Sequence, residues 1–172
     1  ENSRNALFEA MQRRETFGTS GPRITPRFFA GWNIDPDLCR SREYLADAYR
    51  DGVPMGSDLP TAPPAAQHGP VFIASASRDP RDGGNLLQRI QIIKGWIDAD
   101  GKARERIHDI AVSDGRKIGS DGRARTPVGT TVDIPNAGFT NTIGAPLLAA
   151  HWRDPDFDPK ERAFYYVRVL EI

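Results

Sequence analysis

The alternation of apolar and polar residues is clearest between Leu86 and Val112, where two strand-forming runs flank a tight-turn sequence. The turn contains Asp100-Gly101, a pair that supplies the positive φ needed for a short connection between strands. The stretch therefore predicts a β-hairpin with one buried face, which needs further sheet to cover it. In an even register, the inner face carries Ile90, Ile92, Trp96, Ile110 and Val112, and the outer face carries Arg89, Gln91, Glu105 and Asp109.

The segment before the hairpin predicts one helix and one strand. Residues 3–15 form a helical pattern in which Ser3 is the N-cap. Such a short helix is marginal alone, so we expect its apolar stripe to dock on another surface. The stripe consists of Leu7, Ala10 and Met11. Residues 23–34 then alternate as a strand does, and Pro26 places that strand at an edge or at a bulge.

The remaining segments are mostly strand-like. Residues 38–50 fit a helical stripe, and the proline-rich residues 52–70 predict a long loop around at most one short strand at 53–55. Further strands are expected over 71–77, 130–134, 145–152 and 163–172. The last run is apolar on both faces, which predicts a central strand. About seven strands without βαβ alternation indicate a mainly β fold, an antiparallel β-sandwich with one short N-terminal helix.

Composition narrows the functional classes. The 172 residues carry a net charge of +0, so no basic patch indicates nucleic-acid binding. No apolar run approaches the roughly 20 residues of a membrane-spanning helix, so we expect a soluble chain. Cys39 is the only cysteine, which rules out an internal disulfide and favours a buried thiol. The sequence is compatible with several cellular compartments, and export is one of them.

The run that follows His151 is the nearest approach to a metal site. Carboxylates at alternate positions of a turn can converge on a hard cation such as Ca²⁺, and here they are Asp154, Asp156 and Asp158. Pro159 stands where an EF-hand loop needs glycine, so the pattern favours a solvated Asp-Pro turn over a calcium site. His68, His108 and His151 lie on separate segments without zinc-site spacing, and His108 reads as a packed strand residue.

Two further groups could bind ligands. A turn flanked by arginines could form an anion-binding nest, and the alternative is a plain turn with solvated arginines. The candidate anion or substrate-proximal residues are Arg14, Thr19, Ser20, Gly21 and Arg23. Aromatic residues could form a stacking platform for sugars or bases, although their place in apolar strands favours core packing. These aromatic residues are Trp32, Trp96, Trp152, Tyr165 and Tyr166.

Several stretches together resemble an uncharacterised bacterial family of large proteins. The N-terminal part of those proteins is similar to the polymerase-and-histidinol-phosphatase (PHP) class of metallohydrolases, related to carbaryl-hydrolase-like enzymes. The stretches include RRETFGTSGPRI, RFFAGW, GVPMG, RIQIIKGW, WRDPDFDP and AFYYVRVLEI, which lie at 13–24, 27–32, 52–56, 89–96, 152–159 and 163–172. The resemblance covers nearly the whole chain and favours extended structure over 38–50.

The resemblance implies a C-terminal piece of a longer protein, and a start without methionine agrees with that expectation. Residues 1–22 would be the last helix and turn of an upstream hydrolase-like domain, and residues 23–172 a β-rich C-terminal domain. The metal ligands of that class lie upstream, so no catalytic residue is transferred to this chain. We expect no cofactor here, a divalent metal such as Mn or Zn in the upstream domain, and an accessory role. The alternative is a ligand- or carbohydrate-binding β-sandwich module.

Overall fold

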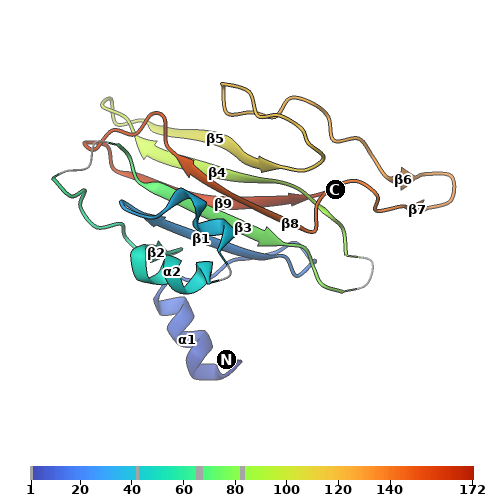
Figure 1. Cartoon of the computed structure of the whole chain (residues 1–172), viewed down its shortest axis with the longest axis horizontal. Helices are drawn as coiled ribbons and strands as arrows, with labels where there is room; N and C mark the ends of the chain where they lie inside the picture. The colour runs from blue at the N-terminus through green and yellow to red at the C-terminus, as the bar shows by residue number, and fades with distance from the viewer. Residues whose placement is uncertain (1, 42, 65–67, 82–83) are drawn as a thin grey trace.

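The computed structural model describes residues 2–41, 43–64, 68–81 and 84–172, and it consists mainly of antiparallel β-strands. The strands are β1 (Thr25–Gly31), β2 (Val53–Pro54), β3 (Val71–Ser77), β4 (Leu87–Ile97), β5 (Ala103–Val112), β6 (Val132–Asp133), β7 (Gly138–Phe139), β8 (Leu147–Arg153) and β9 (Ala163–Glu171). Sheet A has the order β2-β1-β3-β8 and sheet B the order β5-β4-β9, while β6 and β7 form a small separate hairpin. Sheets A and B pack on each other without closing into a barrel (Figure 1), which confirms the predicted sandwich.

The main core lies between the two sheets. Strand β3 is central in sheet A, and its residues from Val71 to Ala76 are buried, as its uninterrupted small and apolar sequence predicts. Strand β4 is central in sheet B, so the hairpin found first in the sequence is half of this core. The buried members of the core are Ile24, Phe28, Phe72, Ala74, Ala76, Leu87, Ile90, Ile92, Ile110 and Leu148.

A second core covers the outer face of sheet A. It is formed by a 3₁₀ helix, η1 (Pro36–Arg40), and by α2 (Tyr44–Asp51), which pack against Phe29 and Ile73 (Figure 1). The expectation of extended chain over 38–50 was wrong, and so was the expectation of a single helix. The reason is local: Asp35 caps η1 by accepting the Asp37 N–H at 2.9 Å, and the apolar stripe of the segment faces the sheet.

One β-bulge changes the predicted face of the hairpin. The pairing of β4 with β5 shifts between Ile90 and Gln91, so Ala111 lies opposite Ile90 and Val112 opposite Arg89. Because an extra residue reverses the alternation, Ala111 packs against the core and Val112 leaves it. The predictions of Ile90 and the other isoleucines as inner residues were correct, and that of Val112 was wrong.

Strand β9 is an edge strand, not the central strand that its sequence predicted, because β4 is its only partner among the described strands. Tyr165, Val167 and Val169 pack against the inter-sheet core. On the other face, Phe164 is 63% exposed and Tyr166 is 43% exposed. The alternation of side chains along a strand carries no information on how many neighbouring strands it has.

The N-terminal helix α1 (Arg4–Gln12) extends away from the sandwich (Figure 1). Ser3 caps it as predicted, because its hydroxyl oxygen accepts the Ala6 N–H at 3.3 Å. None of its residues is buried, so the expected docking of its stripe is not seen among the described residues. The loop over 52–70 contains only the short β2 among its described residues, as predicted, and residues 65–67 lie outside the described part.

Candidate functional site

A cleft of about 750 Å³ opens where the two sheets are not closed, between β1 and β2 on one side and β9 on the other. Pro26 and the following residues of β1 lie beside this opening because β2 pairs only with Phe29 and Ala30. The lining includes several aromatic rings, those of Phe17, Phe28, Phe72, Phe157, Phe164, Tyr165 and Tyr166. A concave, mostly apolar surface with a few polar groups is the usual form of a small-molecule site.

The polar part of the cleft centres on Lys94, whose side chain is only 2% exposed. The ammonium group of Lys94 lies 2.7 Å from Asp154 Oδ2 and donates a hydrogen bond of 2.9 Å to the carbonyl oxygen of Asp156. It also lies 3.7 Å from a carboxylate oxygen of Glu161. Lys94 therefore ties the turn after β8 to the centre of sheet B.

Asp154 is the acceptor at the centre of this network. The Tyr165 hydroxyl donates to Oδ2 at 2.7 Å, and the Asp156 N–H donates to Oδ1 at 2.9 Å. Burial alone would raise the pKa of Asp154, but the bonds from Lys94 and Tyr165 hold it below its ordinary value. Burial raises the pKa of Tyr165, and the neighbouring Asp154 raises it further. At neutral pH the carboxyl is thus an anion and the phenol is a neutral donor.

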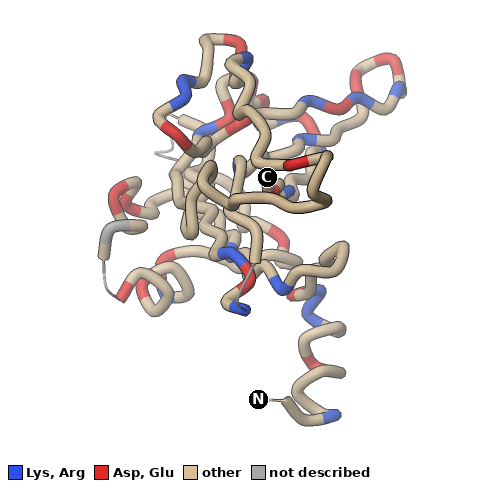
Figure 2. Tube along the Cα trace, turned by 90° about the vertical axis from the view of Figure 1, so that its right-hand side faces the viewer, with Lys and Arg blue, Asp and Glu red and all other residues tan. Residues whose placement is uncertain are grey.

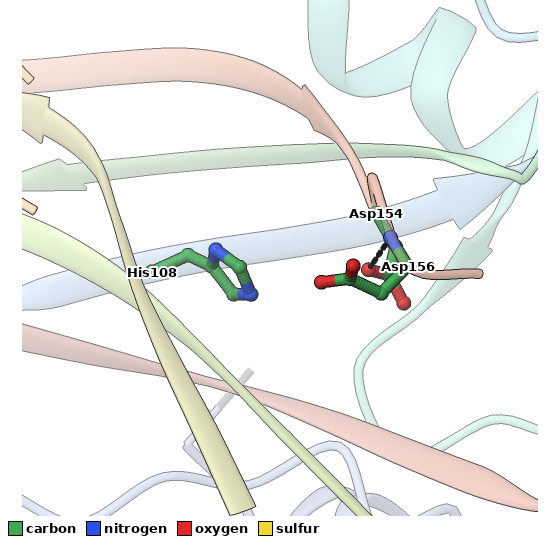
Figure 3. Close-up of side chains that lie close together, drawn as sticks. All are labelled: His108, Asp154 and Asp156. Carbon is green, nitrogen blue, oxygen red and sulfur yellow. Dashed lines mark hydrogen bonds between the residues drawn. The ribbon is translucent and has the colours of Figure 1, made fainter. Parts of the chain in front are cut away.

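His108 faces the same turn from β5. Its side chain is nearly buried, and its ring lies against that of Trp152 with a centroid distance of 4.8 Å. Ligand atoms of His108, Asp154 and Asp156 lie within 4.8 Å of one another, and Figure 3 shows the imidazole directed toward the two carboxylates. Burial lowers the pKa of His108, which the charge of Asp154 partly opposes. The imidazole is therefore neutral at neutral pH.

The predicted carboxylate set is divided by the structure. Asp154 and Asp156 lie together, whereas Asp158 accepts the Lys160 N–H at 2.8 Å in the following turn. His151 is exposed on β8, and the histidine beside the carboxylates is His108. Sequence reasoning missed His108 because the hairpin and the turn are far apart in the chain. The sequence feature that could have indicated His108 was its position on the inner face of the predicted hairpin.

The candidate anion-binding residues have separate partners. Arg14 lies 3.5 Å from Asp58 in a pair exposed at the rim of the cleft, and the Arg23 backbone N–H donates to Asp79 at 2.6 Å. The three residues of the intervening turn are exposed, and the glycine among them has a φ of 125°. They are Thr19, Ser20 and Gly21. Charged residues are distributed over the described chain with both signs interspersed (Figure 2).

The tryptophans lie mostly in packed positions. Trp152 packs against the inter-sheet core, and Trp32 donates its indole N–H to the Pro60 carbonyl oxygen at 2.8 Å. Trp96 lies beneath Lys94, with the ammonium 5.2 Å from the ring centre. Among the described residues that line the cleft, the aromatic rings belong to phenylalanine and tyrosine. Any stacking surface in the cleft therefore does not use the tryptophans.

Comparison with known protein families gives a match over the whole chain. The sequence model of one family, described as a protein of unknown function (DUF3604), matches residues 1–172. The chain belongs to the DUF3604 family. No curated protein and no solved structure matches it. In this DUF3604 chain, no helix among the described residues is long and apolar enough to cross a membrane.

Proposed function

We propose that this chain is the accessory C-terminal β-domain of a bacterial metal-dependent hydrolase and is not catalytic by itself. Residues 1–22 would form the junction with an upstream hydrolase-like domain, and residues 23–172 the accessory domain. The upstream domain would carry the divalent metal, Mn or Zn, and the catalytic residues. The observation that carries the proposal is the exposed apolar face of α1.

The exposure of α1 is unusual for so short a helix. Leu7 is 55%, Phe8 56% and Met11 61% exposed, and no residue of its nine is buried. A helix of this length is marginal in water, because most helical stability in proteins comes from packing of an apolar face. Covering these three side chains with another domain would contribute about 3 kcal/mol, since full burial of one such side chain is worth about 1.5–3 kcal/mol. The upstream domain supported by the resemblance is the occupant we propose.

The test replaces two of these side chains in the parent polypeptide. Leu7→Glu combined with Met11→Glu should leave the unfolding midpoint of the 172-residue chain within about 1 °C, because both side chains are exposed there. In the metal-loaded parent, the same change should lower the unfolding temperature and turnover together. Val132→Glu is the matched control, because Val132 is 62% exposed on the separate β6–β7 hairpin.

Two outcomes would overturn the accessory role. The first is a parent that keeps its stability and turnover after both helix substitutions. The second is unchanged stability and turnover after deletion of residues 23–172. A matching loss with Val132→Glu would show that any charge on the surface has the effect, and the role of α1 would be rejected.

The cleft favours a second function, that of a ligand- or carbohydrate-binding module. Its ring-rich lining and the exposed Tyr166 offer faces on which sugars stack, and Glu161 offers a hydrogen-bond acceptor beside Lys94. Saturation-transfer NMR with a panel of oligosaccharides tests this, because it needs no tryptophan in the site. Binding that is weakened at least fivefold by Tyr166→Ala would support the module. The absence of saturation transfer to every oligosaccharide of the panel would rule out the binding module.

A further inference from the structure

The imidazole of His108 has an unsatisfied ring nitrogen inside the protein. His108 is 4% exposed, and its Nε2 is buried without a hydrogen-bond partner among the described residues. Most buried polar atoms in folded proteins have a partner, so an unpaired ring nitrogen points to a group that is held there. The ring is confined on its other side by Gly122, where an added Cβ would lie 2.8 Å from His108 Nδ1.

The unpaired nitrogen faces two carboxylates. Ligand atoms of His108, Asp154 and Asp156 are within 4.8 Å of one another, a spacing that one ion can bridge after small side-chain shifts. Figure 3 shows the three side chains converging from β5 and from the turn after β8. Nitrogen from a neutral imidazole, with two carboxylate oxygens, is a donor set typical of Zn²⁺ and Mn²⁺, whereas Ca²⁺ takes oxygen ligands.

Two positive groups also touch these carboxylates. Arg106 pairs with Asp156, but their side chains are 54% and 51% exposed, so this pair is weak and can open for a competing cation. Lys94 occupies Asp154 Oδ2 together with Tyr165. Asp154 Oδ1 accepts only the Asp156 N–H in the described contacts, and a carboxylate oxygen can accept two partners. Oδ1 thus has capacity for an ion while Lys94 stays in place.

We propose that His108, Asp154 and Asp156 form a divalent transition-metal site of the Zn²⁺ or Mn²⁺ type. The ion would join β5 of sheet B to the turn that follows β8 of sheet A, and it would give the buried imidazole its missing partner. This site uses His108 in place of the His151 and Asp158 of the sequence pattern, and it selects a nitrogen-binding metal over calcium. It is independent of the metal proposed for the upstream domain.

The test is titration of the 172-residue chain with Zn²⁺, Mn²⁺ and Ca²⁺ by calorimetry, together with the unfolding temperature at saturating metal. We expect one equivalent of Zn²⁺ or Mn²⁺, a raised unfolding temperature, and no comparable response to Ca²⁺. His108→Phe, which fills the same space, and Asp156→Asn should each weaken binding at least tenfold. His151→Phe is the control, because it removes an exposed histidine from β8 and should leave binding unchanged.

Several results would overturn the site. Absence of Zn²⁺ and Mn²⁺ binding is one, and binding that survives His108→Phe in a chain with unchanged circular dichroism is another. Loss of binding with His151→Phe would place the metal on the surface, and a response to Ca²⁺ alone would exclude the imidazole. Changes in Mn²⁺-induced broadening of the His108 ring signals provide a readout that does not depend on stability.

Discussion

Removal of the Lys94 charge should destabilise this chain strongly. Lys94→Met keeps the length of the side chain and its apolar stem but deletes the ammonium group. Among the described residues, Asp154, whose side chain is 0% exposed, then keeps the Tyr165 hydroxyl and the Asp156 N–H as its partners. Removing one partner of a buried ion pair typically costs about 3–5 kcal/mol, because the remaining charge is left without compensation.

The loss should appear in urea unfolding followed by circular dichroism, with a chelator present so that no metal ion compensates Asp154. With a denaturant slope of about 2 kcal/mol per molar urea, a loss of about 3 kcal/mol lowers the midpoint by roughly 1.5 M. Adding Asp154→Asn should restore at least half of that loss, because no uncompensated charge then remains. Lys102→Met, on an exposed residue of the same hairpin, should change stability by less than about 0.5 kcal/mol.

The reasoning would be refuted if Lys94→Met lowered the free energy of unfolding by less than about 1 kcal/mol, since a buried carboxylate without a cation should destabilise the fold by more than that. It would also be refuted if the double substitution were as unstable as the sum of the two single changes. With metal ions removed, either result would mean that Asp154 reaches water in the folded protein, and that the network around Lys94 does not hold the turn.

Four further predictions concern other parts of the fold. Gly56→Ala should cost about 2 kcal/mol in urea unfolding, because φ is +86° and the new Cβ would collide with the Arg14 carbonyl oxygen. Gly101→Ala, at φ +76° with open space around it, should cost only about 1 kcal/mol. Asp109→Asn should cost about 2 kcal/mol and speed hydrogen exchange at the Ala124 amide, which donates to this fully buried carboxylate at 2.7 Å. Burial raises the pKa of the Cys39 thiol, so less thiolate is present at any given pH. Alkylation of Cys39 at pH 8.5 should therefore be slower in the native chain than in urea. Equal rates would contradict this prediction.

The limits of sequence reasoning are clearest in the candidate site. The turn that contains Asp154 and Asp156 was identified from its alternating carboxylates, and in the following turn Asp158 accepts the Lys160 N–H. The histidine that meets these carboxylates is on another strand, and only the packing of sheet A on sheet B brings it there. The candidate residues around Gly21 show the reverse case, because neighbours in sequence acquire different partners in the fold.

The sequence alone determined the class of fold and most of its strands, since alternation of apolar residues and turn-forming pairs are local properties. It identified the central hairpin and the strand over 71–77. Tertiary structure decided which strands are edges, where the bulge moves Val112 outward, and that residues 38–50 form helices against sheet A. It also decided the cleft and the partners of Lys94, because these depend on contacts between segments that are distant in the chain, which no local pattern encodes.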